Sequence, residues 1–206
     1  MNPKDITRKS YEETAEEYAS NVEDLAPFPS MEKFIQMLPP KATLLDIGSG
    51  SGRDAKIFSE RGLQVTGVDI CENLLKIAKA HAPLAQFYLM DMESMTFPED
   101  TFDGVWSSSA LPHLSKEKLP HVINSIHSIL KKGGAFYFNL KQGSGEGLEN
   151  DDRYEPNRPK FWAYYEADEI RTILQEAHFI ILELSHSPKR LSYQSHDVFR
   201  VFCRKP

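Results

Sequence analysis

Cysteine is scarce in this sequence. The 206 residues contain two cysteines, Cys71 and Cys203, which lie far apart, and no CxxC pair or histidine at metal-ligand spacing accompanies them. Disulfide frameworks and zinc sites both need clustered ligands. We therefore expect two reduced cysteines and no bound metal.

Long apolar runs and an excess of positive charge are also missing. No apolar stretch approaches the roughly 20 residues that cross a bilayer, and the opening segment MNPKDITRKSYEETAEEY is too polar for a signal peptide. A net charge of −6 disfavours a nucleic-acid partner, which usually needs a basic face. We expect a cytoplasmic protein without membrane or nucleic-acid partners, and the sequence indicates no oligomeric state.

Alternating short apolar runs and amphipathic segments dominate the middle of the chain. A helix is expected over residues 10–20, where Ser10 and Glu13 fit a capping box, and a second short helix ends at two prolines, 39–40. Apolar runs then alternate with helical spacing, which is typical of parallel strands joined by crossover helices. The expected strands are 42–47, 64–69, 85–91, 102–107 and 134–140, and the expected helices are 52–61, 71–81 and 116–131, the last ended by Gly133.

The final third begins with a polar, glycine-rich stretch. KQGSGEGLENDDRYEPNRPKFWAYY shows no periodicity over about 25 residues, which is long for a plain connection and suggests a substrate loop. A helix over 166–177 and strands near 179–185 and 197–203 follow. No second core or repeat is visible, so residues 1–206 form one domain with a cofactor-binding half at 41–141 and a substrate-side insert and closing strands at 142–206.

The stretch LLDIGSGSGRDA places a glycine turn directly after the first strand. Ligands of doubly wound sheets lie beyond the carboxyl ends of the strands, so this turn faces a ligand. Gly50 to Ala55 also satisfies the loose GxGxxA pattern of dinucleotide sites. Asp46 would repel a pyrophosphate, whereas it suits the cationic methionine part of S-adenosylmethionine, and glycine amides suit its carboxylate.

Acidic residues end the next two strands as well. Asp69 lies 69 − 52 = 17 residues after the last glycine, where a carboxylate can accept hydrogen bonds from both ribose hydroxyls. Asp91 and Met92 follow the third strand, where the carboxylate can take an adenine amino group and the thioether can cover the ring. Three acids at successive strand ends form one constellation.

These motifs resemble the class I S-adenosylmethionine-dependent methyltransferases, of the small methyltransferase-11/25-like type. The resemblance covers roughly residues 10 to 205 and rests on LLDIGSGSGRDA, VTGVDI, YLMDMESMTFPEDTFDGVWSSSALPHL and LKKGGAFYFNL. It implies an α/β, Rossmann-like, doubly wound sheet of seven strands, mostly parallel with an antiparallel last strand and helices on both faces. It also implies that the cofactor contacts Gly48, Ser49, Gly50, Gly52, Asp69, Ile70, Asp91 and Met92.

The resemblance assigns a role to the N-terminal segment too. SYEETAEEYA is similar to a segment that folds over the cofactor in many relatives, so residues 1–40 are expected to form a helical lid with Tyr11 or Tyr18 near the methionine end. Ser49 stands where many relatives carry cysteine, and this change should be harmless.

Several residues near the expected methyl group have two interpretations. Ser107, after the fourth strand, is expected to pass close to the sulfonium. Arg53 can meet the cofactor carboxylate or pair with Asp54 or Glu60. His113 can act as a general base that deprotonates the acceptor, or it can pack on the sheet at a helix entry.

The acceptor side is less informative. Lys141, Arg153, Arg158 and Lys160 could bind an anionic substrate group or simply be solvated. Phe161, Trp162, Tyr164 and Tyr165 could form a pocket wall or anchor the loop in the core.

The sequence therefore predicts an S-adenosylmethionine-dependent methyltransferase that releases S-adenosylhomocysteine, with a small-molecule acceptor favoured over RNA or protein. An NAD(P)-dependent oxidoreductase and a binding protein that holds the cofactor without catalysis are the alternatives.

Overall fold

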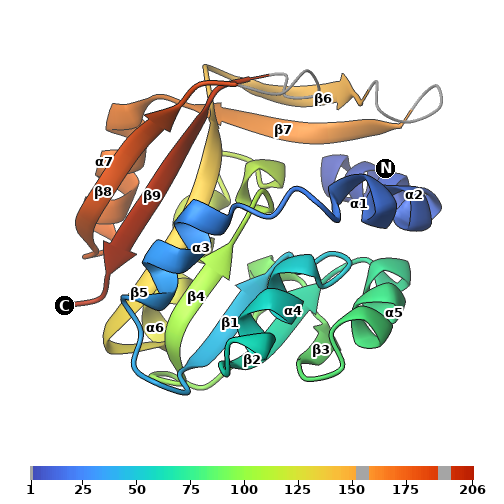
Figure 1. Cartoon of the computed structure of the whole chain (residues 1–206). Coiled ribbons are helices and arrows are strands. Elements are labelled where there is room, and N and C mark those ends of the chain that lie inside the picture. The colour runs from blue at the N-terminus through green and yellow to red at the C-terminus, as the bar shows by residue number, and fades with distance from the viewer. Residues whose placement is uncertain (1, 152–157, 190–195) are drawn as a thin grey trace.

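One large sheet organises the molecule (Figure 1). The computed structural model describes residues 2–151, 158–189 and 196–206. Their strands are β1 Thr43–Ile47, β2 Gln64–Asp69, β3 Gln86–Leu89, β4 Phe102–Ser107, β5 Leu130–Gln142, β6 Glu146–Asn150, β7 Pro159–Tyr165, β8 Ile180–Ser187 and β9 Val198–Arg204. Their helices are α1 Pro3–Glu13, α2 Ala15–Val22, α3 Phe28–Ile35, α4 Arg53–Glu60, α5 Glu72–His81, α6 Leu119–Ile129 and α7 Ala167–Glu176, with short 3-10 turns η1 Met92–Ser94 and η2 Leu111–His113.

The strand order confirms the doubly wound arrangement. β3, β2, β1, β4 and β5 are neighbours in that order and run parallel, while β9 pairs antiparallel with β5 and β8 pairs antiparallel with β9. These seven strands match the expected set. The order reverses between β1 and β4, which is the point where such sheets bind ligands.

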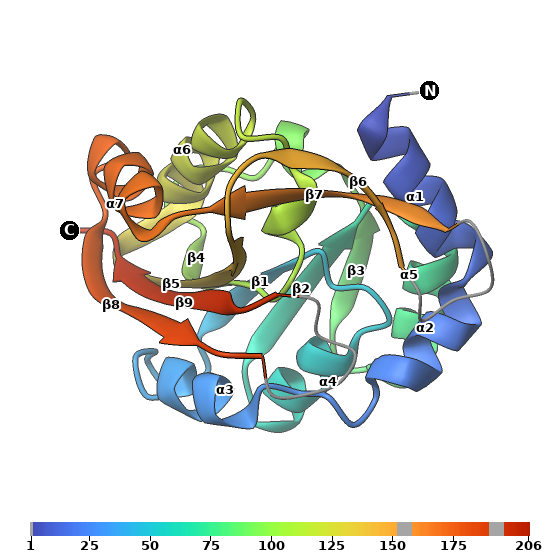
Figure 2. The same cartoon turned by 90° about the horizontal axis from the view of Figure 1, so that it is seen from above.

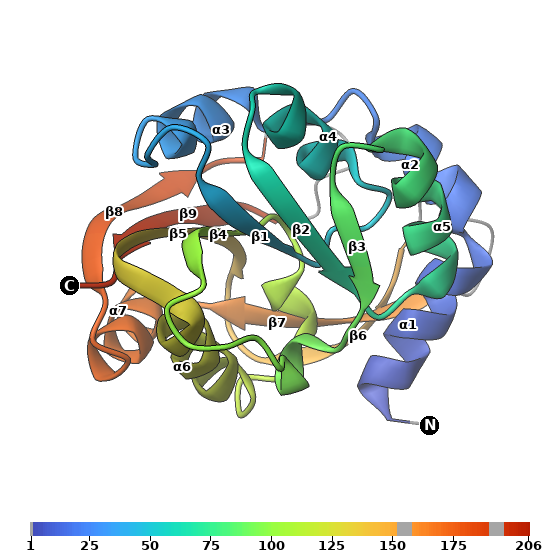
Figure 3. The same cartoon turned by 90° about the horizontal axis from the view of Figure 1, so that it is seen from below.

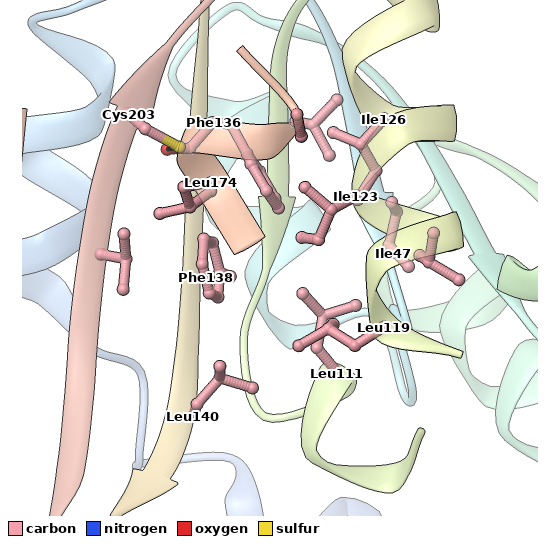
Figure 4. Close-up of a cluster of buried hydrophobic side chains, with 14 of the residues drawn as sticks. Ile47, Leu111, Leu119, Ile123, Ile126, Phe136, Phe138, Leu140, Leu174 and Cys203 are labelled. Carbon is pink, nitrogen blue, oxygen red and sulfur yellow. Dashed lines mark hydrogen bonds between the residues drawn. The ribbon is translucent and has the colours of Figure 1, made fainter. Parts of the chain in front are cut away.

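Helices cover both faces of the sheet, with α3 and α4 on one side and α6 and α7 on the other (Figures 2 and 3). Successive side chains of a strand point to opposite faces, so each strand contributes to both layers. Leu45, Val105 and Phe138 pack with α6 and α7 in the core that Figure 4 shows in part. Leu44 and Trp106 pack with α3, α4 and α5 on the opposite face.

The stretch expected to lack regular structure contains a hairpin instead. β6 pairs antiparallel with β7, and β7 adds parallel to the end of β5 through Lys141↔Tyr164 and Gln142↔Tyr165. The sheet of the described residues therefore has nine strands, two more than predicted. β6 was invisible because its burial alternates between exposed and half-buried and its sequence, EGLEN, is polar. Figure 1 shows the hairpin above the upper ends of β4 and β5.

The N-terminal helix was predicted too short and with the wrong cap. Asn2 caps α1 by accepting a hydrogen bond from the Asp5 N–H (2.8 Å), and Pro3 occupies the first helical position, where its missing N–H costs nothing. Ser10 is buried inside α1 and caps nothing. The chain breaks at Thr14 and continues as α2, so the expected single helix over 10–20 is two helices.

Most other boundaries agree with the prediction to within a few residues. Gly133 was expected to end the helix over 116–131, but α6 already ends at Ile129. Gly133 lies inside β5 with a φ of 77°. Of the helices that the structure describes, none has the length and apolar character needed to traverse a bilayer. The described residues also bring together no group of three or more histidine, cysteine, aspartate or glutamate side chains that could hold a metal.

Candidate active site

A cavity lies where the carboxyl ends of β1 to β4 meet, beneath the N-terminal helices. The strand ends supply a glycine turn, an acidic end, a pair of methionines and a serine-rich segment, and α1 and α2 supply a roof. The lining residues are Thr7, Arg8, Tyr11, Tyr18, Gly48, Gly50, Val68, Asp69, Ile70, Cys71, Leu74, Met90, Met92, Ser108, Ser109, Ala110 and His113. We call this the first cavity.

The glycine turn owes its shape to positive φ angles and close packing. Gly48, Gly50 and Gly52 have φ of 70°, 54° and 82°, a region that glycine adopts without steric cost. A Cβ on Gly48 would lie 2.2 Å from the Cβ of Ala110, so no side chain fits there. A Cβ on Gly50 would lie 3.4 Å from the Tyr18 ring. Gly48 and Gly50 therefore present bare backbone to the cavity, whereas the predicted Gly52 does not line it and packs against Ala78 of α5.

Asp69 connects the glycine turn to the end of β2. Its Oδ2 accepts a hydrogen bond from the Gly50 N–H (2.9 Å), and its Oδ1 accepts one from the Cys71 N–H (2.8 Å). Burial raises the pKa of Asp69, and the backbone N–H groups partly oppose that shift. Each carboxylate oxygen keeps a second lone pair, so Asp69 can still accept hydrogen bonds from a ligand in the cavity.

Asp46 lies below the turn and lines neither this cavity nor the one described below. It is buried, and its Oδ2 has no hydrogen-bond partner among the described residues. Burial raises its pKa strongly, and Asp54 adds to this effect while Arg53 opposes it. A buried acceptor without a donor is costly, so an ordered water or a ligand ammonium would stabilise it.

Arg53 is held by its neighbour at the start of α4. Its Nε donates to Asp54 Oδ1 (2.7 Å), and one terminal nitrogen donates to the Val22 carbonyl (3.2 Å). Asp54 also accepts from the Trp106 indole N–H (2.8 Å). Of the two predicted partners the structure selects Asp54, and the buried acid at this helix start disfavours a pyrophosphate.

Asp91 and Met92, the two residues predicted to contact adenine at the end of β3, have different surroundings. Met92 lines the first cavity, but Asp91 does not. Asp91 Oδ2 forms an ion pair with Lys4 of α1 (2.6 Å), and its Oδ1 accepts from the Glu93 N–H (2.9 Å). The adenine role of Asp91 therefore stays a prediction that requires Lys4 to move or share this carboxylate.

Both candidate tyrosines lie in the roof of the cavity. The Tyr11 and Tyr18 rings meet edge to face with centroids 5.1 Å apart. His113 Nδ1 lies 2.7 Å from the Phe161 carbonyl, which can only accept, so Nδ1 carries the proton and Nε2 accepts from the Tyr11 hydroxyl at 3.0 Å.

Burial lowers the pKa of His113 to about 3, with smaller contributions from the charges of Lys160 and Lys141. A neutral imidazole with both nitrogens engaged is a weak candidate for proton abstraction. The general-base role stays a prediction. In the observed contacts, His113 positions the Tyr11 hydroxyl.

Contacts from both halves of the chain hold the roof in place. The Phe161 N–H of β7 donates to Thr7 Oγ1 (2.8 Å), and the Glu12 carboxylate accepts from the Glu72 and Asn73 N–H groups at the start of α5 (2.7 and 3.0 Å). Helix α1 therefore bridges the cofactor half and the hairpin.

A second cavity, of about 340 Å³, adjoins the first. Tyr11, Tyr18, Ser108 and Ser109 line both. Its other walls come from β5, β7, β9, α4 and the segment after α2: Val22, Leu25, Pro27, Arg53, Pro112, Tyr137, Asn139, Leu140, Lys141, Trp162, His196, Val198 and Arg200. Two connected cavities can bring two reactants together at the shared residues.

The predicted anion-binding residues separate in the structure. Lys141 lines the second cavity, with its ammonium 3.4 Å from the Trp162 ring centroid. Lys160 is fully buried and pairs with Asp151 (2.9 Å), and Arg158 pairs with Glu13 (2.9 Å). The predicted Arg153 lies outside the described residues.

The aromatic residues of β7 and the serine after β4 also have clear places. Phe161, Trp162, Tyr164 and Tyr165 are buried, so they anchor the hairpin, and only Trp162 also lines the second cavity. Ser107 is fully buried and donates to the Ile47 carbonyl (3.2 Å), so the cavity contacts come from Ser108 and Ser109 instead.

Comparison with known proteins agrees with this geometry. Residues 45–138 match the model of a methyltransferase domain family. These residues therefore belong to that methyltransferase domain family. The 1,6-didemethyltoxoflavin-N1-methyltransferase of Burkholderia thailandensis, solved with S-adenosylhomocysteine, superimposes with a TM-score of 0.77 over 100% of this chain and 91% of its own, at 21% identity.

Sequence relatives of the methyltransferase domain are longer proteins. The 2-methyl-6-phytyl-1,4-hydroquinone methyltransferase of Synechocystis sp. is 30% identical over 132 residues, which cover 62% of this chain and 38% of that enzyme. The malonyl-[acyl-carrier protein] O-methyltransferase of Serratia marcescens is 29% identical over 110 residues, 53% of this chain and 42% of that enzyme. The chain thus aligns with less than half the length of these relatives.

Several residues that line the two cavities were missed because the sequence marks them only weakly. Thr7 and Arg8 precede the helix that was predicted, so they were missed with its true start. Tyr137, Asn139 and Lys141 alternate along the fifth strand, and this spacing of two could have placed them on one face. Arg200 becomes their neighbour only through the pairing of β9 with β5.

Proposed function

We propose that this protein is an S-adenosylmethionine-dependent methyltransferase that binds its cofactor in the first cavity and a small-molecule acceptor in the second. The observation that carries the proposal is that the two cavities share Tyr11, Tyr18, Ser108 and Ser109 above the switch point of the sheet. A binding protein without catalysis would not need the second cavity.

The residues of the first cavity fit the parts of S-adenosylmethionine. Asp69 would accept hydrogen bonds from the ribose, and Ile70 and Met92 would contact the adenine. Gly48, Gly50 and Tyr18 would surround the methionine part. The unpartnered Asp46 Oδ2 below the turn, with Ser49 and Gly52 close in sequence, would stabilise the ammonium through a water or a small shift of the turn.

When bound, the cofactor supplies an electrophilic methyl group on a sulfonium. Transfer of this methyl group to the acceptor's lone pair would break the carbon–sulfur bond, leave its electron pair on sulfur and give S-adenosylhomocysteine. The acceptor's proton would pass to solvent once the site reopens. The protein's part is to orient two reactants and exclude solvent, which can contribute roughly 7–11 kcal/mol. α1 and α2 would serve as the lid that does this.

The oxidoreductase alternative finds no support in the geometry. Two buried acids, Asp46 and Asp54, flank in sequence the glycine turn that would hold the phosphates of a dinucleotide. A small acceptor is favoured over RNA or protein because α1, α2 and β7 all contribute walls to the second cavity and the net charge is −6.

Calorimetric titration with S-adenosylhomocysteine, S-adenosylmethionine and NADH tests the proposal. We expect micromolar binding of the first two and none of NADH. Binding of NADH alone would refute it.

A further inference from the structure

The walls of the second cavity are cationic and aromatic. Among the described residues that line it, the charged side chains are Arg53, Lys141 and Arg200, and no aspartate or glutamate is present. We propose that the methyl acceptor is a small aromatic acid whose anionic group lies between Lys141 and Arg200. This inference rests on the proposed function and names the chemical class of its acceptor.

Strand register brings these two cations together. β5 and β9 pair antiparallel with Asn139 opposite Arg200 and Lys141 opposite Val198. Residues two apart on a strand share a face, so Lys141 and Arg200 are diagonal neighbours on the face that lines the cavity. Diagonal neighbours lie about 7–8 Å apart, so both side chains can reach one carboxylate.

Arg53 contributes less to this charge. Asp54 holds its guanidinium in an ion pair at 2.7 Å, so its positive charge is compensated locally. His196 also lines the cavity, and burial lowers its pKa, which keeps the imidazole neutral at pH 7. Near Arg200, the Glu183 carboxylate of β8 is paired with Lys33. Lys141 and Arg200 are the two lining cations that the strand register places next to each other.

The aromatic walls favour a planar molecule. Tyr11, Tyr18, Tyr137 and Trp162 all line the cavity, and aromatic side chains pack well against a ring. The buried Tyr137 hydroxyl makes no hydrogen bond of good geometry within the described residues, although Ser30 lies close enough to lower its pKa. Burial nevertheless raises the pKa of Tyr137 to about 12, so it stays a donor for an acceptor oxygen.

The two ends of the cavity set the orientation of such an acid. Ser108 and Ser109 line both cavities, so the reacting hydroxyl or amine would lie there, next to the methyl group. The Ser109 N–H donates to Asn139 Oδ1 (2.6 Å), which joins this end to the strand that carries Lys141. The carboxylate would lie beside Asn139, between Lys141 and Arg200.

The experiment measures binding in the presence of saturating S-adenosylhomocysteine. The probes are salicylate, anthranilate and para-hydroxybenzoate, each beside its neutral carboxamide, titrated by calorimetry into the wild-type protein and into Arg200→Gln and Lys141→Gln. Arg171→Gln and Lys132→Gln change exposed residues away from the cavity and serve as matched controls. Circular dichroism confirms that each variant is folded.

We expect at least one acid to bind about tenfold or more tightly than its carboxamide, since a charge-assisted hydrogen bond is about twice as strong as a neutral one. Arg200→Gln and Lys141→Gln should each remove most of that difference, while the control variants keep it and carboxamide binding changes less than about twofold.

Three outcomes would overturn the inference while S-adenosylhomocysteine binds normally and the proposed function stands. The protein could bind no probe, bind the acids no better than the carboxamides, or keep its preference for the acids after both substitutions. Failure of S-adenosylhomocysteine to bind overturns both.

Discussion

Replacing His113 with asparagine should remove a defined part of the pH dependence of stability. The folded protein holds His113 as a neutral imidazole between Tyr11 and the Phe161 carbonyl, and burial lowers its pKa to about 3 from 6.5. Protonation therefore favours the unfolded chain. The stability that depends on neutral His113 is fully present above pH 6.5 and is lost as the pH falls towards 3.

The size of the effect follows from the same two values. A difference of 6.5 − 3 = 3.5 between the pKa values corresponds to a ceiling of about 5 kcal/mol, at about 1.4 kcal/mol for each unit. At pH 5 the unfolded imidazole is almost fully protonated and the folded one is not, so the loss relative to pH 8 is about 2 kcal/mol.

Urea unfolding at pH 8 and pH 5, followed by fluorescence of the buried Trp106 and Trp162, measures this loss. His113→Asn keeps a donor for the Phe161 carbonyl but cannot titrate, so its loss between the two pH values should be about 2 kcal/mol smaller than that of the wild type. His121→Asn, at an exposed position of α6, is the control and should behave as the wild type. An equal loss in wild type and His113→Asn would refute the buried neutral imidazole.

Two further predictions concern the first cavity. Asp69→Ala should weaken binding of S-adenosylhomocysteine by about 1.5–3 kcal/mol, measured by calorimetry, because a charged acceptor for the ribose is lost; Asp103→Ala, at the opposite end of the sheet, is the control, and unchanged affinity of Asp69→Ala would exclude the ribose role. Gly48→Ala should lower the free energy of unfolding, measured in urea, by at least about 2 kcal/mol more than Gly62→Ala does. Both positions have positive φ, so both variants are strained, but only at Gly48 would the new Cβ lie 2.2 Å from Ala110. Equal losses would contradict the close packing of the turn.

The sequence contained enough information for the parallel half of the sheet. β2 and β4 have the predicted boundaries, because each is a short run of strand length that contains β-branched or aromatic residues and is followed by a helical segment. The hairpin was not predicted because β6 is polar and lies at an outer edge, and its partner β7 is apolar without alternation over residues 161–165. Periodicity alone cannot detect a strand of either kind.

The candidate site was predictable where residues follow a strand directly. Gly48, Gly50 and Asp69 line the first cavity because adjacent parallel strands bring their carboxyl ends together. Contacts between distant residues decided the rest. Lys4 donates a hydrogen bond to Asp91, 87 positions away in the sequence, and Trp106 donates one to Asp54, 52 positions away. No local pattern encodes such pairs, and the same holds for the meeting of Lys141 with Arg200.

The bridging position of α1 has a consequence for the order of assembly during synthesis. Among the described elements this helix is synthesised before the others, yet Glu12 can accept from the start of α5 only after residue 73 has emerged, and Thr7 meets its donor, Phe161, only 154 residues later. Local helices form early, whereas contacts of such separation wait for long loops to close. On a growing chain the first helix is therefore among the last elements to dock, and the site acquires its roof only after the sheet beneath it has formed.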